Sequence, residues 1–176
     1  MAKLIALLRG VNVAGHNRLK MKDLEDACST LGYRDAITYL QSGNVVFKTE
    51  KPPEVAATAL EEELKKKLNL EVWVVCKSQA QLKRILGSSP FPSSSESETK
   101  KLHVTFLSKV PKPENLSRIS QRTFGKDEFH LQSTEIFISC QGSYGKTKLS
   151  NAFFEKALDL KATTRNWDTV TALSEL

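Results

Sequence analysis

The order of apolar and polar positions in the first 77 residues predicts one complete α+β unit. Nearly continuous apolar runs predict two central strands, and a mixed run predicts an edge strand. Two stripes of apolar residues at helical spacing predict two helices, the first ending near Gly32 and the second starting after Pro52. The predicted elements are a strand at 4–8, a helix at 21–31, strands at 38–40 and 45–47, a helix at 53–69 and a strand at 72–76. This β-α-β-β-α-β order is that of the ferredoxin-like fold.

A similar order begins again after residue 100. Before it, Ser78 and Gln81 form a capping-box pattern that predicts a short helix, and the Ser-rich residues 87–99 are expected to form a mobile surface loop. The predicted elements beyond this loop are a strand at 102–107, a helix at 113–121, strands at 128–131 and 135–140, a helix at 148–158, and a short turn with a closing helix within 162–176.

A faint internal repeat supports two similar halves. Residues 40–42 (LQS) and residues 131–133 (LQS) each precede an apolar strand, at an offset of 131 − 40 = 91. We therefore predict an α+β protein of two ferredoxin-like (βαββαβ-type) halves packed together, with a C-terminal helix. The expected boundaries are a first lobe at 1–77, a connector of helix and Ser-rich loop at 78–100, and a second lobe with the closing helix at 101–176.

The composition is that of an ordinary globular chain with a modest excess of basic residues. Its 176 residues include 26 Lys and Arg against 20 Asp and Glu, a formal net charge of +6 at pH 7. No apolar run approaches the roughly 20 residues of a membrane-spanning helix, and the first one is too short for a secretory core, so we expect a cytoplasmic protein with no membrane partner. Residues 1–22 contain no acid, and residues 100–126 are rich in bases. Such stretches attract phosphate-bearing partners, although a solvated surface is the simpler explanation.

Metal, disulfide and catalytic patterns are missing. The three cysteines lie far apart without C-x-x-C spacing, and Cys76 and Cys140 share the alternation of apolar strand residues, so they are expected to be small buried hydrophobes. The three histidines are not spaced as ligands, and His103 is expected to be structural. We therefore expect no metal and no cofactor, and no catalytic residue is assigned. If the protein is an enzyme, His16 is its best general acid or base, because it lies in a Gly-rich loop.

Two polar segments of the first half follow or connect predicted strands. Residues 9–17 come directly after the first strand and combine glycines with groups that bind anions. Residues 41–44 join two predicted strands. A hairpin turn does not need the side-chain amide of the glutamine at position 41, which is therefore a candidate binding group. Both segments are also explained as plain turns, because Gly and Asn are the commonest turn residues. The candidate binding side chains are Arg9, Asn12, Gln41 and Asn44.

Two further segments lie in the second half. Residues 142–150 resemble the end of a phosphate loop, but Cys140 stands where the G-x-x-x-x-G-K-[ST] pattern needs glycine, so a nucleotide hydrolase is disfavoured. A weaker anion site, with Lys146 beside the start of a helix, remains. Residues 163–167 bring Arg165, Asn166 and Trp167 together, and these side chains suit a phosphate and a stacked ring. The structural alternative is a helix start with the indole in the core.

Four segments in this order resemble one known family. They are LLRGVNV at 7–13, YLQSGNVVF at 39–47, GKTKLSN at 145–151 and TTRNW at 163–167. The chain resembles the bacterial domain-of-unknown-function 1697 family over essentially its whole length. The resemblance implies paired ferredoxin-like lobes, and it implies no established substrate, cofactor or catalytic residue.

We expect the polar segments to converge on one cleft that binds a small anionic or nucleotide-like ligand, because their side chains are binding groups and no activated nucleophile is visible. Nucleic-acid (RNA) binding through the basic surface is the alternative, although the predicted central strands lack exposed aromatic residues on which bases stack. An enzyme of unknown reaction is the third class. The expected ligand-binding residues are Arg9, Asn12, Gln41, Asn44, Lys146, Arg165, Asn166 and Trp167.

Overall fold

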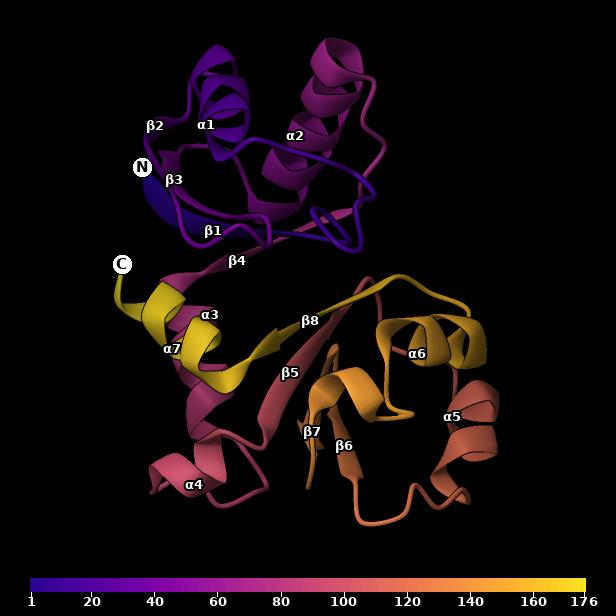
Figure 1. The fold of residues 1–176 in the computed structure, drawn as a ribbon. Helices are drawn as coiled ribbons and strands as arrows, with labels where there is room; N and C mark the ends of the chain where they lie inside the picture. The colour runs from indigo at the N-terminus through magenta and orange to yellow at the C-terminus, as the bar shows by residue number, and fades with distance from the viewer. The chain divides into compact units, whose positions relative to one another are not determined.

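A computed structural model describes all residues, 1–176, as two compact units (Figure 1). One unit comprises Met1–Lys83 and Leu173–Leu176, and the other comprises Arg84–Ala172. The elements before the second sheet are β1 (Ala2–Leu8), α1 (Met21–Thr30), β2 (Arg34–Thr38), β3 (Asn44–Thr49), α2 (Pro53–Leu68), β4 (Val74–Ser78), α3 (Gln79–Gly87) and α4 (Glu96–Thr99). Those that follow are β5 (Leu102–Leu107), α5 (Pro113–Ser120), β6 (Glu128–Gln132), β7 (Glu135–Ser139), the 3₁₀ turn η1 (Tyr144–Lys146), α6 (Asn151–Leu158), β8 (Ala162–Asn166) and α7 (Trp167–Glu175).

Both units have the topology of the ferredoxin-like fold. The first sheet has the strand order β2-β3-β1-β4 and the second has β6-β7-β5-β8, and every neighbouring pair is antiparallel. The first and third strands of each unit are therefore central, as the apolar runs predict. The predicted fold class, α+β with two ferredoxin-like halves and a C-terminal helix, is confirmed. None of the helices combines the length and the apolar character that crossing a membrane needs.

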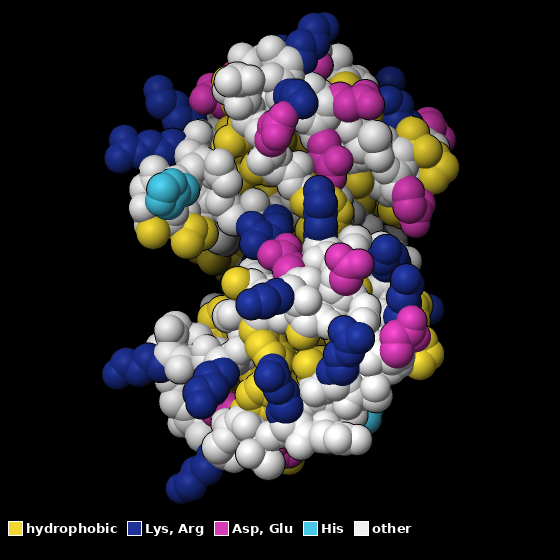
Figure 2. All heavy atoms as spheres, turned by 90° about the vertical axis from the view of Figure 1, so that its right-hand side faces the viewer, with side chains coloured by type: hydrophobic (Ala, Val, Ile, Leu, Met, Phe, Trp, Pro, Cys, Tyr) yellow, Lys and Arg dark blue, Asp and Glu magenta, His cyan; other side chains and the backbone are white.

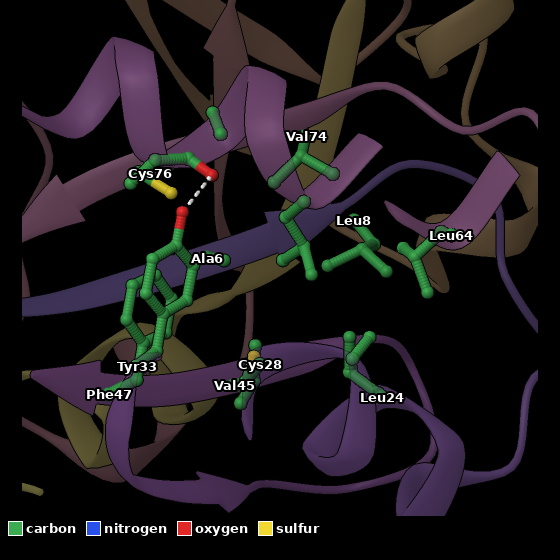
Figure 3. Close-up of a cluster of buried hydrophobic side chains, with 14 of the residues drawn as sticks. Ala6, Leu8, Leu24, Cys28, Tyr33, Val45, Phe47, Leu64, Val74 and Cys76 are labelled. Carbon is green, nitrogen blue, oxygen red and sulfur yellow. Dashed lines mark hydrogen bonds between the residues drawn. The ribbon is translucent and has the colours of Figure 1, made fainter. Parts of the chain in front are cut away.

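The core of the first unit lies between its sheet and the helices α1 and α2, which cover one face of that sheet (Figure 1). Tyr33 stacks on Phe47 with ring centroids 4.5 Å apart, and its hydroxyl donates a hydrogen bond to the carbonyl of Ala56 at 3.1 Å (Figure 3). Burial raises the pKa of Tyr33 and that of the neighbouring Cys28 thiol to about 12. All three cysteines are buried and unpaired, so they act as small apolar residues, as predicted.

The core of the second unit is built around four phenylalanines. Phe124, Phe129, Phe153 and Phe154 meet edge to face, with ring centroids between 5.2 and 5.8 Å apart. This arrangement is favoured because the positive edge of one ring meets the negative face of the next. Phe154 is fully buried, whereas the other three rings are partly exposed at one end of the cluster.

The strand β8 corrects the sequence prediction, which placed only a turn and a helix in 162–176. The β-branched Thr163 and Thr164 favour an extended chain, and Thr164 lies opposite Thr105 of β5, where their hydroxyls share a 2.7 Å hydrogen bond. Thr163 and Arg165 are both buried. Because Ala162 is the one buried apolar residue of β8 and the other buried residues are polar, no apolar alternation marks this strand in the sequence.

Two helix boundaries also differ from prediction, and capping explains both. Ser150 caps α6, since its Oγ accepts the Phe153 N–H at 3.2 Å, so this helix begins at 151 and not at 148. Residues 96–99, predicted to be part of an unstructured loop, form the single turn α4. Its capping box joins the Ser95 hydroxyl to the Glu98 N–H and the Glu98 carboxylate to the Ser95 N–H.

Candidate functional site

The loop between β1 and α1 is a compact structure held by its own backbone. Positive φ angles occur at Gly10, Asn12, Ala14, Gly15 and Asn17, and such angles favour Gly and Asn. The N–H of Asn12 donates to the carbonyl of Asn17 at 3.1 Å, and the Asn17 amide donates to the carbonyl of Gly10 at 3.1 Å. The glycines and asparagines that the sequence singled out therefore shape the loop.

Asn12 fastens this loop to the turn between β2 and β3. Its Nδ2 donates to the carbonyls of Leu19 (2.9 Å) and Gln41 (2.8 Å), while its Oδ1 accepts the Leu19 N–H (2.9 Å). The two polar segments of the first half are thus brought together, as predicted. Because its amide is fully engaged by backbone groups, Asn12 positions the site rather than offering its amide to a ligand.

Gly43 sets how closely the loop and the turn approach. Its φ is +78°, and a Cβ atom at this position would lie 2.4 Å from Val11 Cγ2 and 2.9 Å from Leu8 Cβ. Both the dihedral angle and the space therefore require glycine. Its carbonyl accepts the N–H of Leu8 at 2.8 Å, which ties the turn to the end of β1.

A pocket of about 480 Å³ opens where the loop, the turn and the start of α1 meet. This volume lies within the range of small-molecule sites. The side chains of Arg18, Lys20, Asp23 and Gln41 form no hydrogen bond or ion pair within the protein. They are therefore available to a ligand. The residues that line the pocket are Asn12, Gly15, Arg18, Leu19, Lys20, Asp23 and Gln41.

The amino-terminal end of α1 adds a positive field to this pocket. The residue before the helix, Lys20, provides no side-chain cap, so the first N–H groups of α1 are not covered by a capping side chain. Lys22 pairs with Asp26 at 3.0 Å and does not line the pocket. Two cations and one carboxylate, Asp23, thus leave the pocket with a net positive charge.

The remaining candidates of the first half do not line this pocket. Arg9 is half-buried, and its backbone N–H donates to the carbonyl of Trp73 at 2.9 Å. Asn44 is fully buried, and its Nδ2 donates to the Tyr39 carbonyl (2.8 Å) and the Ser42 hydroxyl (2.9 Å). Asn44 therefore closes the turn. His16 is exposed on the loop, where its backbone N–H donates to the carbonyl of Val13 at 2.9 Å.

The candidates of the second half belong to the other unit, and three of them make structural contacts. Arg165 is 7% exposed and donates to the Thr163 hydroxyl (2.8 Å) and the Thr164 carbonyl (2.9 Å), and burial lowers its pKa to about 10. The side chain of Asn166 accepts the Thr169 N–H at 2.8 Å and so caps α7. Trp167 is buried at the start of that helix.

Lys146 is exposed in η1, five residues before α6 begins. The neighbouring Thr147 hydroxyl donates to an Asp127 oxygen at 2.6 Å, and the second oxygen of Asp127 accepts the Gln141 N–H at 2.9 Å. A carboxylate therefore lies beside this segment, and the N-terminus of α6 is already capped by Ser150. Both features oppose an anion site here.

Three pocket residues and one buried pair are not apparent from the sequence. Arg18 and Lys20 stand out there only as part of the basic stretch 1–22, and Asp23 only as the acid that ends it, although their position just before and inside the first turn of a helix is a usable signal. His103 stacks on Tyr144 with centroids 4.5 Å apart. The Nδ1 of His103 and the hydroxyl of Tyr144 are buried without a hydrogen-bond partner, and burial lowers the pKa of His103.

Comparisons with known proteins show a family and a fold, without an activity. The chain is similar, at 18% sequence identity and a TM-score of 0.76, to a solved structure described as conserved bacterial protein SP0830 from Streptococcus pneumoniae. The similarity covers 99% of this chain and 97% of that one. No curated protein matches the chain. A family model described as a protein of unknown function, DUF1697, matches residues 1–137, which include the whole pocket. The chain therefore belongs to this family of unknown function, DUF1697.

Proposed function

We propose that this protein binds a small anionic, nucleotide-like ligand in the pocket of its first unit. The observation that carries the proposal is the group of four unpartnered polar side chains around that pocket, which lies at the start of a helix. Charged side chains that serve only folding or solubility usually point into open solvent, whereas Arg18 and Lys20 line a concave surface beside a helix start that no side chain caps.

The arrangement favours a ligand that carries both an anionic group and hydrogen-bond donors. Arg18 offers a planar guanidinium that suits a phosphate or carboxylate, and Lys20 adds a second positive charge. Asp23 repels a bare anion but accepts hydrogen bonds from hydroxyl or amino groups, and Gln41 both donates and accepts. A mononucleotide or a sugar phosphate has these groups, and the pocket of about 480 Å³ is larger than inorganic phosphate alone requires.

Binding, rather than turnover, is the function that this geometry supports. The pocket contains no cysteine, serine or histidine, so it offers no thiol or serine hydroxyl nucleophile and no imidazole base. His16 lies in the same loop without lining the pocket. The hydrogen-bonded Asn12 and the buried Gly43 hold the loop and the turn together, which matches a preformed binding site.

Thermal unfolding in the presence of mononucleotides, sugar phosphates and inorganic phosphate tests the proposal. A ligand at 100 times its Kd should stabilise the protein by about 2.7 kcal/mol. The double variant Arg18→Gln, Lys20→Gln should lose this stabilisation while keeping the stability of the free protein, because neither side chain has an internal partner. Lys66→Gln, on the exposed surface of α2, is the matched control.

The variant Asp23→Asn separates the ligand classes. It should strengthen the binding of inorganic phosphate, because it removes a repelling charge, and it should weaken the preference for ligands with hydroxyl or amino donors. If no phosphate-bearing compound stabilises the protein, or if the double variant responds as the wild type does, the proposal is wrong.

A further inference from the structure

The second unit carries a large set of basic side chains that pair with no acid. Between residues 109 and 161, nine Lys and Arg side chains are exposed, against three exposed acids, Glu114, Glu128 and Asp159. None of the nine forms an ion pair. In the first unit, by contrast, five lysines have carboxylate partners. The nine are Lys109, Lys112, Arg118, Arg122, Lys126, Lys146, Lys148, Lys156 and Lys161.

One of these bases, Arg122, lies over an aromatic ring of α6, and two more, Arg118 and Lys156, belong to α5 and α6. The guanidinium of Arg122 lies 5.9 Å from the ring centre of Phe153 on α6. Arg118 lies in the last turn of α5, four residues before Arg122, which follows the end of that helix. Lys156 follows Phe153 by three residues, a spacing that places both on the same side of α6. In the lower part of Figure 2, which looks onto α5 and α6, dark blue side chains surround yellow ones.

A second pocket, of about 510 Å³, adjoins this basic surface at the carboxyl end of α5. Arg122 lines it and is thus shared between the surface and the pocket. Phe124 and Phe129 meet edge to face with ring centroids 5.8 Å apart and form its aromatic wall, and His130 and Ser120 supply polar groups. Two carboxylates also line the pocket: Glu128, and Asp127, whose oxygens already accept the Thr147 hydroxyl and the Gln141 N–H. An aromatic recess with a few polar groups beside a row of cations suits a flat heteroaromatic ring attached to a phosphate chain.

We infer that this face of the second unit binds single-stranded nucleic acid. Phosphates of the strand lie along Arg118, Arg122 and Lys156, and one unstacked base enters the pocket and stacks on the exposed part of the Phe124 ring. A base reaches such a recess only when it is free to leave its neighbours, so a single strand is favoured over a duplex. The aromatic groups line a hollow rather than protrude, which disfavours an anionic membrane as the partner.

This site is independent of the proposed ligand pocket, since the two belong to different units and share no residue. The predicted central strands lack exposed aromatic residues on which bases could stack, but the aromatic residues of this pocket lie on the helical side of the unit. Three phosphate contacts predict that the logarithm of the affinity falls with the logarithm of salt concentration with a slope of about −2.

The test is the fluorescence anisotropy of a labelled 12-nucleotide uridine oligomer titrated with the whole protein. Phe124→Leu keeps an apolar side chain in the core and should weaken binding about 5- to 150-fold, the loss of one stacked base. The triple variant Arg118→Gln, Arg122→Gln, Lys156→Gln should weaken binding further and flatten the salt dependence. Circular dichroism confirms that each variant is folded.

Two controls make the result specific. Lys65→Gln with Lys66→Gln removes two exposed bases from α2 of the first unit and should leave oligomer binding unchanged, as should Arg18→Gln with Lys20→Gln. Equal affinity for a duplex, unchanged affinity in Phe124→Leu, or binding of phosphatidylserine vesicles without binding of the oligomer would each overturn the inference. Loss of oligomer binding in the Arg18, Lys20 variant would overturn it too, because the first-unit pocket would then be responsible.

Discussion

Replacing Gly43 with alanine should destabilise the first unit strongly, because two separate costs act at this position. A non-glycine residue at a φ of +78° costs about 1 kcal/mol or more in backbone energy. The new Cβ would also lie 2.4 Å from Val11 Cγ2 and 2.9 Å from Leu8 Cβ, and such overpacking typically costs about 1 to 3 kcal/mol. We therefore expect a total loss of about 2 to 4 kcal/mol in the free energy of unfolding.

Urea denaturation followed by circular dichroism measures this loss, and Gly32→Ala is the matched control. Gly32 has a similar φ of +74°, but a Cβ there would meet no atom within 4 Å, so it should lose only the backbone part. In a Val11→Ala background, the cost of Gly43→Ala should fall, because the closest clash is removed. Equal costs for Gly43→Ala and Gly32→Ala, or no coupling to Val11, would refute the reasoning.

Three further predictions concern Asn12, His103 and the three cysteines. Asn12→Ala should lower the free energy of unfolding by about 1 to 3 kcal/mol and weaken ligand binding, because one hydrogen bond to the turn and two within the loop are lost. Urea denaturation and the ligand titration check it. The stability supplied by neutral His103 should be complete above pH 6.5 and fall as the pH drops below it, because its folded-state pKa is lowered and the unfolded chain binds the proton more readily. In pH-dependent denaturation, His103→Phe should therefore lose less of its free energy of unfolding on acidification than the wild type does. The cysteines should react with a thiol reagent only after unfolding, since burial raises the pKa of each thiol.

Each of these predictions has a distinct contrary result. If Asn12→Ala were as stable as the wild type, water would replace the hydrogen bonds of the Asn12 side chain without a loss in the free energy of unfolding. An acid response in His103→Phe identical to that of the wild type would mean that His103 is protonated as easily in the folded protein as in the unfolded chain. Rapid labelling of the folded protein in the absence of denaturant would contradict the burial of the cysteines.

The fold was predictable wherever burial is apolar. Strands such as β1 and β5 follow directly from their runs of Leu, Ile, Val and Phe, and the capping box at Ser78 and Gln81 is present, with the Gln81 N–H bound to the Ser78 hydroxyl at 3.1 Å. Where the buried residues are polar, the hydrophobic pattern does not reveal the strand. The strand β8 buries Thr163 and Arg165, and a sequence does not reveal that a guanidinium will find its partners among its own neighbours.

The candidate site was predictable in part, for a related reason. The sequence predicted that the segments of Asn12 and Gln41 lie close together, because both consist of turn residues at the ends of adjacent strands. It did not show that the side-chain amides of Asn12, Asn44 and Asn166 form hydrogen bonds with backbone groups, because an asparagine that binds a ligand looks the same in a sequence. Arg18 and Lys20 were hidden among other bases, because only the folded loop shows which of them line the pocket.

An NMR titration of ¹⁵N-labelled protein with adenosine monophosphate and with inorganic phosphate tests the central proposal most directly, because it locates the ligand residue by residue. The account predicts saturable shifts at the amides of residues 12–24 and at Gln41, larger for the nucleotide, and their disappearance in the Arg18→Gln, Lys20→Gln variant. Shifts confined to the second unit, or no saturable shift with either compound, would contradict it.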